Sequence, residues 1–192
     1  MKTKLMTMCA VMAMLMIGSA AQATMLTFTL SEVGDDVVGT VSGAINTDAL
    51  TENQINYTDS GQVHTAYGVL GVGSEHSLWK WTGFSSEASS FGSGAWYDAS
   101  SNTGDYVAVN FSQLSLYTSK DYVSGSEISG TSTWNDMNFE DNMFATPGTY
   151  TMTYNGGADS IVVQVESVPE PATMSLLALG SLGLLRRRRK GA

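Results

Sequence analysis

The sequence predicts an all-β fold for residues 24–167, an antiparallel β-sandwich or a jelly-roll-like arrangement. Gly, Ser, Thr, Val and aromatic residues are frequent there, whereas Lys, Arg, Leu and Glu are scarce, and this composition disfavours long helices. Short runs that alternate bulky and small polar residues follow one another, with turn signals between them. We therefore expect about eight or nine short strands. A closed barrel is the alternative that these patterns leave open.

The first predicted strands are residues 25–30 and 37–45, and the Gly-Asp-Asp turn between them makes them a hairpin. Further runs with strand-like alternation follow along the chain. They cover residues 63–73, 78–84, 105–111, 114–117 and 128–134, and we expect a loop at 85–94. No linker or repeat divides residues 24–167, and their length suits one domain with a single core.

The last hairpin has the clearest pattern. Residues 149–154 read TYTMTY and place two tyrosines and a methionine on one face, because side chains alternate along a strand. The turn at 155–159 reads NGGAD, which contains residues that tolerate positive φ. Residues 160–166 then return as the partner strand.

The N-terminal residues 1–23 have the pattern of a signal peptide. Two lysines precede the apolar residues 5–17, and Ala21-Gln22-Ala23 supplies the small-x-small pattern that signal peptidase reads. Cleavage after Ala23 would start the mature chain at Thr24. A membrane helix or a core helix is the alternative, but the apolar run is short for a membrane span.

Charge and cysteine usage exclude several classes of function. Residues 24–167 hold 17 carboxylates against Lys80 and Lys120, a formal charge of −15. Such a surface repels polyphosphates, so nucleic acid is excluded as a partner. Cys9 is the only cysteine and lies in the predicted signal peptide. The mature chain would therefore have no thiol for a disulfide, a metal site or a nucleophile.

The C-terminal residues 168–190 form a separate segment. Two prolines end the last strand, and residues 172–185 follow without a charge. As a helix these fourteen residues span roughly 21 Å, short of a hydrocarbon core of roughly 30 Å, so they predict a short transmembrane helix inserted transiently in the inner membrane. The positive-inside rule keeps the following cations cytoplasmic. The motif is Pro169, Glu170 and Pro171, and the cations are Arg186, Arg187, Arg188, Arg189 and Lys190.

This order of Pro-Glu-Pro, apolar helix and arginine cluster resembles the PEP-CTERM sorting signal of Gram-negative bacteria. The resemblance implies recognition by an exosortase and cleavage near the motif. It also implies delivery to the cell surface or the extracellular matrix, often in bacteria that produce exopolysaccharide. An ordinary C-terminal tail anchor is the alternative reading. Residues 31–50, 122–139 and 146–165 also resemble a recurrent ectodomain of PEP-CTERM proteins, which adds no site residue.

The sequence singles out no catalytic or cofactor site. His64 and His76 lack the spacing of a zinc site. No nucleophile elbow or phosphate-binding loop is present in the sequence. The densest group of oxygen ligands lacks the EF-hand spacing, so a solvated acidic loop competes with a calcium site there. These candidate calcium ligands are Asp136, Glu140 and Asp141.

Aromatic residues concentrate between residues 79 and 97. Trp79, Trp81 and Trp96 could stack on sugar rings if they are exposed, whereas buried they belong to the core. The sequence therefore favours a non-enzymatic, exported surface or matrix protein, structural or associated with exopolysaccharide. A carbohydrate-binding module or adhesin is the first alternative. A hydrolase is the second, and it would need two carboxylates that face one cleft.

Overall fold

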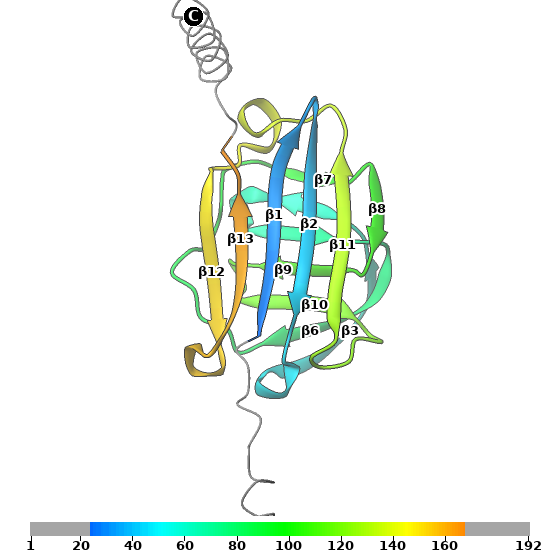
Figure 1. The fold of residues 1–192 in the computed structure, drawn as a ribbon, viewed down its shortest axis with the longest axis vertical. Helices are drawn as coiled ribbons and strands as arrows, with labels where there is room; N and C mark the ends of the chain where they lie inside the picture. Colours follow the sequence, from blue (N-terminus) through cyan, green and yellow to red (C-terminus); the bar gives the residue numbers. More distant parts are fainter. Residues whose placement is uncertain (1–23, 168–192) are drawn as a thin grey trace, which may run out of the picture.

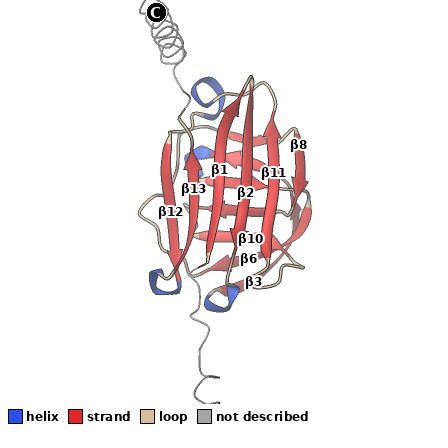
Figure 2. Ribbon diagram, in the orientation of Figure 1, coloured by secondary structure: helices blue, strands red, loops and turns tan. Residues whose placement is uncertain are grey.

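The computed structural model describes residues 24–167, in which two β-sheets pack face to face (Figures 1 and 2). The strands are β1 Met25–Val33, β2 Asp36–Ala44, β3 Thr51–Asp59, β4 Gln62–His64, β5 Val69–Val72, β6 His76–Thr82, β7 Trp96–Asp98, β8 Ser101–Gly104, β9 Val107–Asn110, β10 Ser115–Ser119, β11 Glu127–Trp134, β12 Gly148–Tyr154 and β13 Asp159–Val165. Short helical turns are η1 Thr47–Ala49, η2 Thr65–Tyr67, η3 Phe139–Met143 and η4 Asn155–Gly157.

One sheet has six strands in the order β12-β13-β1-β2-β11-β8, and the other has seven in the order β3-β6-β10-β9-β5-β4-β7. Figure 1 shows the strands of one layer running across those of the other. The all-β, two-layer prediction is confirmed. The prediction of a wholly antiparallel arrangement is wrong at one place, because β1 and β13 pair in parallel.

The core lies between the sheets and follows the alternation of the strands. In β1, Leu26, Phe28 and Leu30 are fully buried, whereas the residues between them are half-buried. The parallel partner β13 contributes Ile161 and Val163 to the same core. Alternation with a period of two places every second side chain on the inner face, so β1 and β13 each supply an apolar row.

The predicted hairpins at both ends of the domain are confirmed. β1 and β2 pair antiparallel, and so do β12 and β13. The turn between β12 and β13 needs positive φ at Asn155, Gly156 and Gly157, which glycine adopts without steric cost. The expected single run 63–73 is instead the hairpin β4–β5, because η2 and Gly68, in the left-handed region, turn the chain within it.

The structure contains thirteen strands in residues 24–167, more than the eight or nine expected. The sequence missed β3, β7 and β8. β3 lies at one edge of its sheet and β4 lies beside the opposite edge, although only Ser60 and Gly61 separate them in the chain. β3 pairs with β6 near both of its ends, with an irregularity in the register between Gln54 and Thr58. Its Ile55 covers a small apolar cluster separate from the main core, made of Leu78, Tyr106 and Ala108.

Several predictions fall outside the described residues. The signal peptide 1–23 with Ala21 and Ala23, and the segment 168–190, lie there. Within residues 24–167, no helix is long and apolar enough to cross a membrane. Because β1 and β13 run in parallel, Thr24 and Ser167 lie at opposite ends of the six-stranded sheet (Figure 1).

Candidate functional site

The structure separates the three tryptophans that the sequence singled out. Trp81 is 8 % exposed and belongs to the core, and its Nε1–H donates to the hydroxyl of Thr118 over 2.9 Å. Trp79 is half-buried against the same core, and its Nε1–H donates to the carbonyl of Lys120 over 3.0 Å. Trp96 is 49 % exposed. Of the three, Trp96 is therefore the ring that a surface ligand can reach.

Trp96 belongs to an exposed aromatic cluster with His64 and Tyr67. The His64 ring lies edge-on to both neighbours, with ring centroids 4.6 Å from Tyr67 and 5.6 Å from Trp96. Tyr67 is 57 % exposed, so the cluster presents two large aromatic side chains to solvent. Both outer rings rest on the same histidine, which restricts the motion of the pair.

Strand pairing brings this cluster together from distant parts of the sequence. β4 pairs antiparallel with β7, and the register places His64 directly opposite Trp96. The turn η2 follows His64 at once and positions Tyr67 beside it. The Nε1–H of Trp96 donates to Oδ1 of Asp98 over 3.2 Å. A carboxylate that can accept hydrogen bonds therefore lies next to the exposed indole.

Thr65 fixes the loop that leads into β7. It is 1 % exposed, its hydroxyl donates to the carbonyl of Met143 over 2.6 Å, and it accepts the N–H of Gly94 over 2.7 Å. The loop approaches so closely that side chains would not fit: a Cβ on Gly92 or Gly94 would lie 2.1 or 2.0 Å from a backbone carbonyl oxygen. The aromatic cluster therefore rests on a tightly packed backbone.

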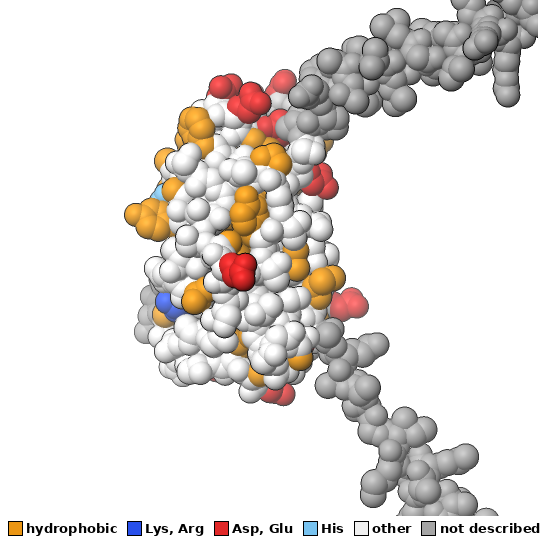
Figure 3. Space-filling view, turned by 90° about the vertical axis from the view of Figure 1, so that its left-hand side faces the viewer, with side chains coloured by type: hydrophobic (Ala, Val, Ile, Leu, Met, Phe, Trp, Pro, Cys, Tyr) orange, Lys and Arg blue, Asp and Glu red, His pale blue; other side chains and the backbone are white. Residues whose placement is uncertain are grey.

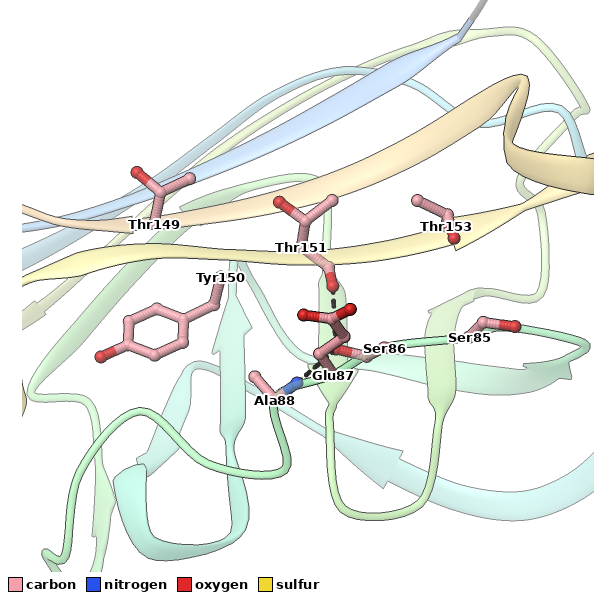
Figure 4. A pocket seen from close by; sticks show the side chains of 8 residues that line it. All are labelled: Ser85, Ser86, Glu87, Ala88, Thr149, Tyr150, Thr151 and Thr153. Atoms are coloured by element: carbon pink, nitrogen blue, oxygen red, sulfur yellow. Dashed lines mark hydrogen bonds between the residues drawn. The ribbon is translucent and has the colours of Figure 1, made fainter.

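A second surface feature is an open groove of about 770 Å³ beside the edge strand β12. The loop after β6 runs along that edge, and Ser85 and Thr153 exchange two backbone hydrogen bonds of 2.8 Å. The hydroxyl of Ser86 donates to the carbonyl of Thr151 over 2.8 Å. The lining residues are Ser85, Ser86, Glu87, Ala88, Thr149, Tyr150, Thr151 and Thr153 (Figure 4).

The groove is mainly a hydroxyl surface with a single carboxylate. Figure 4 shows Glu87 between the loop and Thr151, whereas the Tyr150 ring lies on the other side of the strand from the threonine side chains. Figure 3 views this side of the molecule, which is largely neutral and polar, with separate hydrophobic side chains. Burial raises the pKa of Tyr150, and its hydroxyl donates to the carbonyl of Thr146 over 2.9 Å.

One carboxylate outside these features has a raised pKa. Burial is the main cause of the raised pKa of Asp59, the charge of Asp98 adds to it, and hydrogen bonds from Ser60, Gln62 and Tyr106 oppose it. Gln62 connects the group, because its Nε2 donates both to Asp59 and to the hydroxyl of Tyr106, which is 3.1 Å away. The hydrogen bonds of Asp59, Gln62 and Tyr106 thus lie beside the small apolar cluster that Ile55 of β3 covers, because Tyr106 belongs to both.

The candidate calcium ligands lie in the segment that follows β11. Asp141 forms reciprocal contacts with Asn138, which accepts the Asp141 N–H over 2.6 Å and donates to its carboxylate over 3.3 Å. Asp136 uses its N–H to bind the carboxylate of Asp36 over 3.0 Å. Within residues 24–167, no three His, Cys, Asp or Glu side chains are grouped to hold a metal ion.

Sequence reasoning nominated Trp96 but missed Tyr67, the part played by His64, and the groove. His64 was noted only for the absence of zinc-site spacing. The signal for the cluster was present as a histidine and a tyrosine in one short turn, but their approach to Trp96 depends on the pairing of β4 with β7. The groove depends on the loop after β6 lying along β12, which no local pattern predicts.

Comparisons with known proteins identify one segment. Residues 167–190 match the model of the PEP-CTERM protein-sorting motif. No curated protein and no solved structure matches the chain. The match agrees with the Pro-Glu-Pro triplet, the apolar run and the arginine cluster in the sequence. The chain therefore carries the PEP-CTERM protein-sorting motif, which implies an exported protein that an exosortase recognises and processes.

Proposed function

We propose that this chain is a non-enzymatic protein of a Gram-negative cell surface or extracellular matrix, and that its β-sandwich binds a neutral polysaccharide through Tyr67 and Trp96. The observation that carries the proposal is the pair of exposed rings set against His64. Signal peptidase and exosortase would deliver the domain to the place where such a polymer, an exopolysaccharide, is found.

The chemistry of the aromatic cluster suits a sugar ring. The face of an aromatic ring carries negative charge density, and it attracts the positively polarised C–H groups on the face of a pyranose. Asp98 lies beside the indole and can accept hydrogen bonds from sugar hydroxyls. Aromatic contact with a few fixed polar groups is the usual composition of a small-molecule site in proteins.

The surface charge restricts which polysaccharide can bind. With a formal charge of −15 in residues 24–167, an anionic polymer would be repelled at moderate ionic strength. A neutral polymer experiences no such electrostatic repulsion. The hydroxyl-rich groove along β12 has the same neutral polar character and offers a further surface for the same class of ligand.

The non-enzymatic part of the proposal is supported by the groove. Most glycoside hydrolases place two carboxylates on either side of the bond that they cleave. The described residues that line the groove include one carboxylate, Glu87. The carboxylate nearest the exposed indole, Asp98, receives the hydrogen bond of Trp96 itself. Both features fit a binding surface better than a hydrolytic cleft.

The test is affinity gel electrophoresis of the exported protein in gels that contain hydroxyethyl cellulose, dextran or alginate. We expect at least one of the two neutral polymers to retard the protein, and alginate to leave its mobility unchanged. The variants Trp96→Ala and Tyr67→Ala should each bind about tenfold more weakly, the loss that about 1.4 kcal/mol of stacking implies.

Val123→Ala is the control, because Val123 is 67 % exposed and lies in the loop between β10 and β11, away from the aromatic cluster. It should be retarded like the unmodified protein. Retardation of Trp96→Ala equal to that of the unmodified protein would rule out this binding surface. An unmodified protein that neither neutral polymer retards would rule out the binding function.

A further inference from the structure

Asp159 is a buried carboxylate at the start of β13, and most of its partners come from Thr24. The backbone N–H of Thr24 donates to Oδ1 over 2.7 Å, and the Thr24 hydroxyl donates to the same oxygen over 2.9 Å. Asn155 donates from Nδ2 to Oδ2 over 2.9 Å. The hydroxyl of Tyr154 lies 3.0 Å from the Thr24 hydroxyl. Asp159 is only 3 % exposed.

The hydrogen-bond donors that the structure places on Asp159 are all neutral. Burial raises the pKa of this carboxyl, but the hydrogen bonds from Thr24 and Asn155 outweigh burial and leave the pKa below its ordinary value. The group is therefore ionised at neutral pH. A positive partner adds Coulomb attraction to such a hydrogen bond, which a neutral donor does not supply. The site thus places a full negative charge beside the Thr24 nitrogen.

The nitrogen 2.7 Å from Asp159 is the nitrogen that signal peptidase would release. In the uncleaved chain it is a peptide nitrogen. Hydrolysis of the Ala23–Thr24 bond consumes one water molecule, leaves a carboxylate on Ala23 and leaves an ammonium group on Thr24. We propose that the α-ammonium group of mature Thr24 forms a buried ion pair with Asp159, so that removal of the signal peptide adds a charged link between β1 and β13.

The strand register determines which residue must carry the ammonium group. The Ser160 N–H donates to the carbonyl of Thr24 over 3.1 Å, which extends the parallel β1–β13 ladder and fixes Thr24 in place. One additional residue would carry the ammonium group about 3.8 Å further along the chain. The carboxylate would then keep the neutral N–H of Thr24 but lose the charge. The proposed ion pair therefore requires cleavage after Ala23, and not one residue earlier.

Few other groups titrate at this site. Tyr154 and the adjacent Tyr122 both have pKa values raised above the ordinary 10.0, mainly by burial, so they remain neutral up to at least about pH 9. The ion pair should raise the pKa of the Thr24 amine above its unfolded value of about 7.7 to 8.0. The stability that this shift adds is complete below that unfolded value, and it is lost as pH rises through the folded pKa.

The experiment compares four forms of the exported protein. They are the unmodified protein, a variant with one alanine inserted between Ala23 and Thr24, Asp159→Asn, and the combination of the two changes. In the insertion variant, cleavage after Ala23 still satisfies the small-x-small rule, whereas cleavage after the inserted alanine would put Gln22 three residues before the cut. Intact mass confirms each N-terminus, and Tm is measured at about pH 6 and about pH 10.

We expect the unmodified chain to start at Thr24. The insertion should lower Tm at about pH 6 by at least about 3 °C, and by much less at about pH 10. It should have no effect on Tm in the Asp159→Asn background, because the partner of the charge is then absent. Equal effects of the insertion in both backgrounds, or an unmodified chain that starts elsewhere, would overturn the ion pair.

A second readout covers the case in which Asp159→Asn fails to fold. Competitive labelling with a trace of acetic anhydride across pH, followed by peptide mass spectrometry, gives the pKa of the terminal amine in the folded protein. We expect a pKa at least about one unit above the ordinary value for Thr24 in the unmodified chain. The inserted alanine should show an ordinary value. Equal pKa values for the two amines would contradict the proposal without use of the Asp159 variant.

Discussion

Trp134 donates its Nε1–H to the carbonyl oxygen of Tyr97 over 3.2 Å and thereby links the two sheets. Trp134 ends β11 in the six-stranded sheet, whereas Tyr97 lies in β7 of the seven-stranded sheet. The indole is fully buried. Because Tyr97 is the neighbour of Trp96, a core tryptophan supports the strand that carries the exposed ring. This hydrogen bond therefore connects the core directly to the strand of the candidate binding surface.

The first prediction concerns the space around this tryptophan. A Cβ on Gly39 would lie 3.0 Å from Cζ3 of Trp134, and Gly39 has no positive φ, so the effect of a side chain there is steric. Gly39→Ala should lower the free energy of unfolding by about 1 to 3 kcal/mol, the usual cost of overpacking a core. Urea unfolding monitored by tryptophan fluorescence measures it. Thr40→Ala, at an exposed position in the same strand, should cost clearly less.

The second prediction concerns the backbone that supports the aromatic cluster. Thr65→Val keeps the shape of the side chain but leaves the Met143 carbonyl and the Gly94 N–H without their hydroxyl partner. Two unpaired buried groups should lower the free energy of unfolding by about 2 to 4 kcal/mol. Thr65→Ser keeps the hydroxyl and should retain most of that stability. Similar unfolding midpoints for Thr65→Val and Thr65→Ser would show that the hydroxyl contributes little.

The third prediction uses the raised pKa of Asp59. A carboxyl whose folded pKa lies above its unfolded value of 3.8 destabilises the fold progressively as pH rises from that value to the folded pKa. Asp59→Asn removes this cost. Relative to the unmodified protein, the Tm of Asp59→Asn should therefore be higher at about pH 6.5 than at about pH 3.5.

Its control accounts for the large negative charge of the domain, because removal of any carboxylate reduces repulsion at neutral pH. Asp35→Asn, at an exposed turn, removes the same charge without the burial. The gain in relative Tm between the two pH values should be larger for Asp59→Asn than for Asp35→Asn. Equal gains at both positions would mean that general repulsion, and not the local environment of Asp59, sets the effect.

The sequence predicted elements whose signals are local and missed those that depend on distant contacts. The hairpin of β12 and β13 has strict alternation and a glycine-rich turn. β3 reads TENQINYTD, a polar edge strand with little alternation, and it was missed. The parallel pairing of β1 with β13 joins the two ends of the domain, and no local pattern records it. Likewise, residue type nominated Trp96, but its exposure and its neighbours depend on the tertiary fold.

The last prediction tests the sorting motif itself. Replacement of Pro169 and Pro171 by alanine, with the arginine cluster intact, should prevent processing by exosortase, because the motif is the feature that residues 167–190 share with the family model. Intact mass of protein from each cell fraction measures the result. Unmodified protein at the surface should lack the residues after about Pro171, whereas the variant should retain Arg186 to Ala192 in the inner membrane. If the unmodified chain also retains those residues in the inner membrane, the segment is an ordinary tail anchor, and the proposed delivery to the matrix fails.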